Sequence, residues 1–169
     1  GDGEELGRVG VGSLPDMVTI TADGTSALVA NEGEPAEDYS VDPEGSVSVV
    51  ALPEGLEAPA QSDVRTAGFT AFEDSLPEGV RIFGPEEIDG EEYTTTVAQN
   101  LEPEYIATVD GTAYVTLQEN NAVAVVDIAA AQVTDILPLG TVEHSQPGNG
   151  LDASDRDEKV NIANWPVKG

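Results

Sequence analysis

The sequence contains no cysteine. Disulfide bonds, thiolate zinc sites and cysteine nucleophiles are therefore excluded. This absence does not decide the compartment, because many exported bacterial proteins also lack cysteine. Aromatic residues make up only 5% of the chain, so Val, Ile, Leu and Ala have to supply most of the core.

Basic residues are also scarce, with 6 Lys and Arg against 33 Asp and Glu and a net charge of −27. Such a surface repels nucleic acid and anionic lipid, which makes both poor partners. Three interpretations stay open: a halophile's solvated surface, a binder of divalent cations such as calcium, and partial disorder of acidic segments such as 86–92. The acid is spread along the whole chain, which favours a salty or calcium-rich extracellular setting.

Long apolar runs are missing as well. The longest, from Ala122 to Ala131, is interrupted by Asp127, whereas a membrane helix needs about 20 apolar residues. The first five residues are neither basic nor apolar and do not resemble a signal peptide. The 169 residues predict one domain with a sizeable core and no membrane span.

An internal repeat organises the chain. Residues 14–32 match residues 101–119, with one residue deleted before a turn. The matched landmarks are Pro15 with Pro103, Asp23-Gly24 with Asp110-Gly111, and Asn31-Glu32 with Gln118-Glu119. In each copy an alternating run, an Asp-Gly turn and three further β-branched runs predict four antiparallel strands. In the first copy these runs are 17–21, 26–30, 46–50 and 62–66. In the second copy the first strand precedes the Asp110-Gly111 turn, and the other three runs are 113–117, 122–126 and 132–137.

Four such strands make one propeller blade of roughly 40–45 residues. We therefore predict an all-β chain, a partial β-propeller of about two four-stranded antiparallel blades, within a single domain 1–169. A small antiparallel sandwich is the competing interpretation. The predicted parts are a first blade at 13–68 with acidic insertions at 33–44 and 69–100, a second blade at 101–140, and an inter-blade loop at 141–169. We also expect a lone outer strand at 6–11, a helical turn at 72–76 and a short strand at 80–83.

A propeller closes with 4–8 blades, so two blades leave open edges and unburied sheet faces. The count predicts that the chain pairs through exposed strands with the remaining blades or with neighbouring copies. Neither nucleic acid nor a membrane is an expected partner.

Segments throughout the chain resemble the choice-of-anchor I family. They are LVANEGEP (28–35), VDPEGSV (41–47), FTAF (69–72), GVRIFG (79–84), NLEPEYIA (100–107), YVTLQENNA (114–122), GNGLDASD (148–155) and NIANWPV (161–167). The resemblance implies a large extracellular bacterial propeller, related to YVTN-type repeats, tethered by varied anchors and often labelled alkaline phosphatase-like. Many members have glycine where this chain has Glu158-Lys159, which weakens a calcium loop at that point.

Two groups of acidic residues are candidate calcium ligands, because calcium takes 6–8 hard oxygen ligands. The first group follows the second strand of each blade and comprises Glu32, Glu34, Asp38, Asp42 and Glu119. The second comprises Asp152, Asp155 and Asp157, where neither possible frame matches an EF-hand. For both groups the alternative is an ordinary solvated acidic face.

No catalytic residue is predicted. The only histidine, His144, is adjacent to Ser145, and neighbouring residues of an extended chain point in opposite directions. The sequence therefore indicates an extracellular or cell-surface module with a structural or binding role. The alternative implied by the resemblance is part of a calcium-dependent phosphoester hydrolase, with Glu32, Glu34 and Glu119 as metal ligands.

Overall fold

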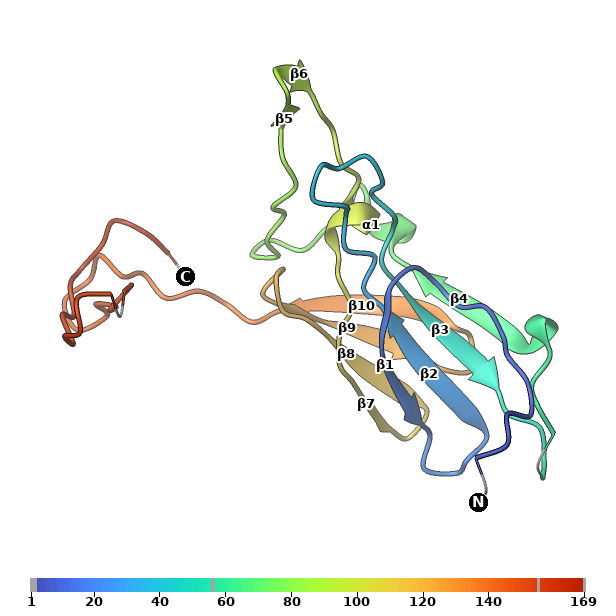
Figure 1. Cartoon of the computed structure of the whole chain (residues 1–169). Coiled ribbons are helices and arrows are strands. Elements are labelled where there is room, and N and C mark those ends of the chain that lie inside the picture. Colours follow the sequence, from blue (N-terminus) through green and yellow to red (C-terminus); the bar gives the residue numbers. More distant parts are fainter. Residues whose placement is uncertain (1–2, 56, 155, 169) are drawn as a thin grey trace. The chain divides into compact units, whose positions relative to one another are not determined.

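A computed structural model describes residues 3–55, 57–154 and 156–168 (Figure 1). The chain forms two compact units, Gly1–Pro138 and Leu139–Gly169. The first unit contains every strand of three or more residues, and the second contains only isolated bridges among its described residues. The all-β prediction is confirmed.

The first sheet is antiparallel, and its strands follow one another in chain order. The strands are β1 (Pro15–Ile20), β2 (Ser26–Asn31), β3 (Ser46–Ala51) and β4 (Val64–Gly68). The turn between β1 and β2 is closed by Asp23, whose carboxylate accepts hydrogen bonds from the Thr21 hydroxyl (2.7 Å) and from the Thr25 N–H (3.1 Å). Short polar side chains commonly close turns in this way.

The second sheet repeats this arrangement. Its strands are β7 (Ile106–Val109), β8 (Thr112–Leu117), β9 (Ala122–Asp127) and β10 (Gln132–Pro138). Asp110 and Gly111 both have positive φ, 47° and 81°, which is the conformation of a two-residue type I′ hairpin turn. The predicted repeat therefore corresponds to two four-stranded sheets, and the arrangement is compatible with two neighbouring blades of a partial propeller.

The core lies between the two sheets. Each sheet turns alternate residues inward, so Leu28, Val49, Val115 and Val126 are fully buried in one continuous cluster. Phe69 and Leu101, from the connection between the sheets, are buried in the same cluster. The first strands β1 and β7 are in contact with each other, and so are the last strands β4 and β10. Both sheets are therefore positioned by a shared core.

The connections contain short elements only. They are the 3₁₀ helices η1 (Gln61–Asp63) and η2 (Thr70–Phe72), the hairpin β5 (Glu87–Ile88) with β6 (Glu91–Glu92), and the helix α1 (Val97–Asn100). The Glu73 carboxylate accepts hydrogen bonds from the N–H groups of Val97 (2.8 Å) and Ala98 (3.0 Å) at the start of α1. Glu73 thereby supplies the acceptors that the first turn of a helix lacks.

Three expectations for these connections need correction. Residues 80–83 do not form a strand, because Arg81 makes a single main-chain bond to Asn120 and no ladder. Residues 6–11 do not form an outer strand, because both main-chain groups of Gly10 bond to the Gln61 side chain. The helical turn expected at 72–76 begins earlier, at Thr70, and continues as a turn through 75.

Candidate functional site

Acidic side chains gather where three segments meet at one end of the two sheets. Glu32 and Glu34 follow β2, Glu102 and Glu104 precede β7, and Glu119 follows β8. This end carries α1, and the turns of the β1–β2 and β7–β8 hairpins lie at the opposite end (Figure 1). We refer to these five glutamates as the carboxylate cluster.

A close backbone contact holds the segment with Glu102 against the first sheet. The Gly45 N–H, just before β3, donates to the Ala98 carbonyl (3.0 Å). A Cβ atom at Gly45 would lie 1.9 Å from the Leu101 carbonyl oxygen and 2.8 Å from the Pro103 ring. Only glycine therefore permits this approach at position 45.

The buried amide of Asn120 fixes the same segment from the second sheet. Its side-chain oxygen accepts a hydrogen bond from the Glu102 N–H (3.3 Å). Its side-chain nitrogen donates to the carbonyls of Asn100 (2.6 Å) and Arg81 (2.9 Å). Glu102 is thus held between the two sheets by main-chain contacts.

Two of the five glutamates are buried. Glu102 is 4% exposed and Glu104 is 7% exposed, whereas Glu32 and Glu119 are half-buried and Glu34 is exposed. Glu104 accepts a hydrogen bond from the Gln118 amide (2.5 Å). The Glu102 carboxyl group receives no hydrogen bond from the described residues, and Glu119 Oε2 is buried without a partner among them. Buried carboxylates are ordinarily hydrogen-bonded or paired, so this cluster is unusual.

The electrostatics of the cluster favour neutral carboxyl groups. Burial, followed by the negative charges of Glu119, Glu32, Glu34 and Glu104, raises the pKa of Glu102 to about 7. Burial and Glu34 raise the pKa of Glu32, and burial and the neighbouring Glu119 carboxyl raise that of Glu104. Desolvation and like charges both disfavour the ionised form.

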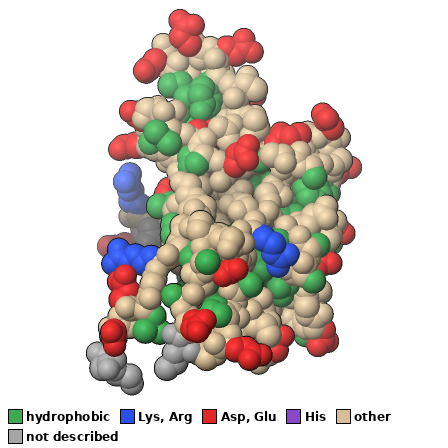
Figure 2. Space-filling model, turned by 90° about the vertical axis from the view of Figure 1, so that its right-hand side faces the viewer, with side chains coloured by type: hydrophobic (Ala, Val, Ile, Leu, Met, Phe, Trp, Pro, Cys, Tyr) green, Lys and Arg blue, Asp and Glu red, His purple; other side chains and the backbone are tan. Residues whose placement is uncertain are grey.

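Basic side chains do not neutralise the cluster. In the described parts of the chain, the one ion pair joins Arg8 to Glu5 on the surface. The Arg81 guanidinium donates to the main-chain carbonyl of Glu119 (3.2 Å) rather than to a carboxylate. Across the face shown in Figure 2, acidic side chains are scattered widely and basic ones are few.

The structure brings together Glu32, Glu34 and Glu119 from the first predicted group and separates the other two. Asp38 is exposed, and its carboxylate accepts a hydrogen bond from the Ser40 N–H (3.0 Å). The Ser40 hydroxyl, followed by this N–H, lowers the pKa of Asp38. Asp42 accepts from the Tyr93 hydroxyl (3.0 Å), and the Tyr93 ring packs edge-on against Tyr39. Asp38 therefore belongs to a local turn of the first insertion, whereas Asp42 links that insertion to Tyr93 of the second insertion.

The second predicted group lies in the second unit. Asp152 accepts from the Asn161 N–H (2.9 Å), and Asp157 accepts from the Asn161 side-chain amide (2.6 Å). Asp155 lies outside the described residues. Near this group, His144 donates through Nδ1 to the Asn149 carbonyl (2.6 Å) and Ser145 donates to Glu143 (2.7 Å), so His144 and Ser145 do not form a nucleophile and base pair.

Sequence reasoning missed Glu102 and Glu104, although the repeat contained a signal for one of them. Matching Pro15 with Pro103 places Asp16 on Glu104, just as Glu32 falls on Glu119. In the structure the negative charge of Asp16 acts on both Glu32 and Glu104. Repeated acidic positions therefore converge at one end of the sheets.

The cluster is not a closed metal site in this structure. Among the described residues, no group of three or more Asp, Glu or His side chains has metal-binding geometry. Any ion would therefore have to draw the side chains closer together.

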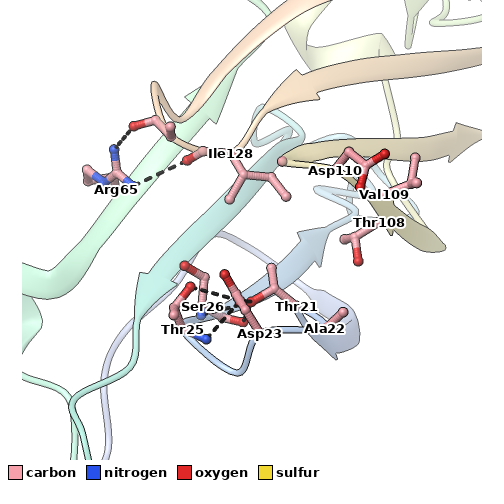
Figure 3. Close-up of a pocket in the computed structure, with 12 residues that line it drawn as sticks. Thr21, Ala22, Asp23, Thr25, Ser26, Arg65, Thr108, Val109, Asp110 and Ile128 are labelled. Carbon is pink, nitrogen blue, oxygen red and sulfur yellow. Dashed lines mark hydrogen bonds between the residues drawn. The ribbon is translucent and has the colours of Figure 1, made fainter.

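A hollow lies at the opposite end of the sheets, between the two hairpin turns. It has a volume of about 420 Å³ and is lined by Thr21, Asp23, Arg65, Val109, Asp110, Ile128 and neighbouring residues (Figure 3). Arg65 donates across it to the carbonyls of Ala129 (2.6 Å) and Ile128 (3.3 Å), and Asp23 is engaged by Thr21 and Thr25. Because Arg65 and Asp23 already have hydrogen-bond partners, the hollow is the weaker candidate for a binding site.

The comparisons with known proteins identify a family over the full chain. The model of the choice-of-anchor I domain matches residues 1–169. No curated protein and no solved structure matches the chain. In the described residues, no helix combines the length and apolar character required to cross a membrane.

Proposed function

Since the chain belongs to the choice-of-anchor I domain family, we propose that it is a structural and binding module of the bacterial cell surface that packs against a further four-stranded sheet. Membership of this family indicates a surface-associated domain. An extracellular location and assembly with another sheet are the parts that the proposal adds.

The outer face of the second sheet supports the proposal. Strand pairing places Tyr114 between Ala107 and Val125 on one face, opposite to the buried face that carries Val115 and Ala124. Large apolar side chains on this outer side are exposed, namely Tyr105 at 59%, Val109 at 54%, Tyr114 at 41% and Leu137 at 42%. Several exposed large apolar side chains on one face of a sheet are typical of an interaction surface.

The proposed occupant is a sheet of the same kind. The opposite face of the second sheet already packs against a four-stranded antiparallel sheet of this chain, and aligned packing of two such sheets recurs in β-proteins. In a solution of this chain alone, a neighbouring copy supplies the further sheet.

Sedimentation velocity tests this assembly in 0.5 M NaCl, which screens the repulsion between highly acidic copies. We expect the wild-type chain to associate reversibly at micromolar concentrations, and the Tyr114→Glu variant to stay monomeric. Val41→Glu is the matched control, because Val41 is 63% exposed but lies in the first insertion. A wild-type chain that stays monomeric at all concentrations would contradict assembly through this face.

The calcium-dependent phosphoester hydrolase stays a prediction from the resemblance. Turnover of p-nitrophenyl phosphate that depends on calcium and is lost with a chelator would support it.

A further inference from the structure

We infer that the carboxylate cluster is a binding site for a divalent cation, with calcium as the ion that suits its chemistry, and that the bound ion links the two sheets. The inference does not depend on assembly of the chain with a further sheet. It rests on the burial of Glu102 and Glu104, on the origin of the five carboxylates in both sheets and in the segment that connects them, and on their chemistry.

Glu102 provides the observation that points to a ligand. Its side chain is 4% exposed and receives no hydrogen bond from the described residues, and it is surrounded by the charges of Glu119, Glu32, Glu34 and Glu104. Glu119 Oε2 is a fully buried oxygen that has no hydrogen-bond partner among these residues. Buried acceptors in this state require a proton, a water or a cation.

The ligands come from both sheets. Glu32 and Glu34 follow β2 in the first sheet, whereas Glu119 follows β8 in the second. Glu102 and Glu104 lie on the connecting segment, which Gly45 contacts from the first sheet and Asn120 contacts from the second. An ion bound to this set therefore opposes separation of the sheets.

A cation neutralises the cluster more completely than a proton does. One proton removes the charge of one carboxylate, but five glutamates share this end of the sheets. A divalent ion attracts all of them at once, and its attraction is strong where burial excludes water.

The ligand chemistry selects among the cations. The cluster offers carboxylate oxygens and no imidazole or thiolate, which disfavours zinc. Calcium accepts 6–8 oxygens in flexible geometry, whereas magnesium demands a near-ideal octahedron at short distances. The adaptable coordination of calcium is therefore the better match to side chains that come from three separate segments. Glu32, Glu34 and Glu119, which are less buried than Glu102, are the side chains expected to rotate inward.

Thermal unfolding of the full chain, stripped with chelator and measured at pH 7.5, tests the site. At a calcium concentration 100 times the dissociation constant, we expect Tm to rise by about 5–10 °C for a chain of this size. Magnesium at the same concentration is expected to give a smaller rise, and NaCl of matched ionic strength a negligible one. Isothermal titration calorimetry should show one calcium bound per chain.

Substitution of the carboxylates gives a signature that a merely structural role would not produce. Glu102→Gln and Glu119→Gln remove a charge without changing the shape of the side chain. In chelator we expect each variant to have a higher Tm than wild type. We also expect the calcium affinity of each variant to be at least tenfold lower than that of wild type. Glu143→Gln is the matched control, because Glu143 lies in the second unit and should keep the full calcium response.

Two results would overturn the inference. An equal calcium response of wild type and Glu102→Gln would show that calcium only screens the acidic surface. A wild-type chain that is stabilised by lowering the pH but not by calcium would show that the cluster holds a proton. Repeating the titration with Tyr114→Glu keeps this result separate from the assembly of the chain, because that variant retains all five glutamates.

Discussion

Acidic side chains occupy two contrasting environments, the carboxylate cluster at one end of the two sheets and the loops of the second unit. Among the described residues of the second unit, Glu143, Asp152 and Asp157 are exposed and accept hydrogen bonds from nearby residues. Glu143 accepts from the Ser145 hydroxyl (2.7 Å), and Asp157 accepts from the Lys159 N–H (3.2 Å). The Ser145 hydroxyl lowers the pKa of Glu143, whereas burial raises that of Glu102 to about 7.

The contrast shows that position decides what an acidic residue does in this chain. Loop carboxylates find donors within a few residues along the sequence, since Ser, Thr and main-chain N–H groups are always near. Carboxylates at the ends of β2 and β8 meet other carboxylates instead, because the fold brings repeated acidic positions together. The loop carboxylates therefore do not destabilise the fold when no ligand is bound, whereas the carboxylate cluster favours a bound proton or cation.

The largest loss of stability is expected for Gly45→Ala, which disrupts the main-chain contact that positions Glu102. The new Cβ would overlap the Leu101 carbonyl oxygen, a main-chain atom that cannot move without displacing the segment with Glu102. We expect a loss of about 2–3 kcal/mol in the free energy of unfolding, measured with urea. Gly68→Ala is the control, because no atom lies within 4 Å of the Cβ position there. Equal stability of both variants would contradict the close contact at Gly45.

The next largest effect is expected in the pH dependence of stability in chelator. An acid whose pKa is raised by folding binds a proton more tightly in the folded state. Glu102 therefore contributes stability that is fully present below its unfolded pKa of 4.5 and is lost as the pH rises through about 7. We expect Tm to fall by about 3–6 °C between pH 5 and pH 8 in wild type, and by clearly less in Glu102→Gln.

Groups that face Glu102 contribute to the same pH window. The glutamates at 32, 34, 104 and 119 act on it directly, and Arg81 contacts the main chain of Glu119. The variant is therefore expected to reduce the slope without abolishing it. An unchanged slope in Glu102→Gln would place the responsible groups elsewhere on the acidic surface.

The sheets were predictable because their signals are local. Alternating residues and Asp-Gly turns predict the hairpin of β7 and β8, and the match of Pro15 with Pro103 predicts a second copy of the same unit. Both four-stranded sheets follow the predicted order. Residues 80–83 were predicted wrongly as a strand, because a β-branched run needs a partner, and Arg81 bonds to a loop carbonyl instead.

The site was predictable only in part, because its geometry depends on the connections. Glu32 and Glu119 were found from the repeat, since both follow the second strand of their sheet. Asp42 was grouped with them by proximity along the chain, but it pairs with Tyr93, which is 51 residues away. The burial of Glu102 depends on the contact at Gly45, and the sequence contains no short-range signal for that contact.

A smaller effect is expected for Glu73→Ala, which tests an acidic residue of the first unit that is hydrogen-bonded. Glu73 accepts from two N–H groups at the start of α1, the helix that leads into the cluster. Loss of a helix cap costs about 1 kcal/mol, and we expect that decrease in urea unfolding. Glu73→Gln, which retains an acceptor oxygen, should lose less. If Glu73→Ala were more stable than wild type, as expected for Glu102→Gln in chelator, the distinction between hydrogen-bonded carboxylates and the carboxylate cluster would be contradicted.

The smallest effect is expected for Glu143→Gln. The pH dependence of stability that this substitution removes has the opposite sign to the one that Glu102→Gln removes. Folding lowers the pKa of Glu143, so this residue contributes stability that is present above its unfolded pKa of 4.5 and is lost as the pH falls through the folded value. Because Glu143 is exposed, we expect no measurable change in Tm between pH 6 and pH 8. Below pH 5 we expect the stability of the variant to depend slightly less on pH than that of wild type. Nuclear magnetic resonance of the His144 ring monitors this loop, because His144 Nδ1 contacts the Asn149 carbonyl there. A gain in stability at pH 8 would mean that loop carboxylates also repel one another, and the contrast with the carboxylate cluster would then be one of degree.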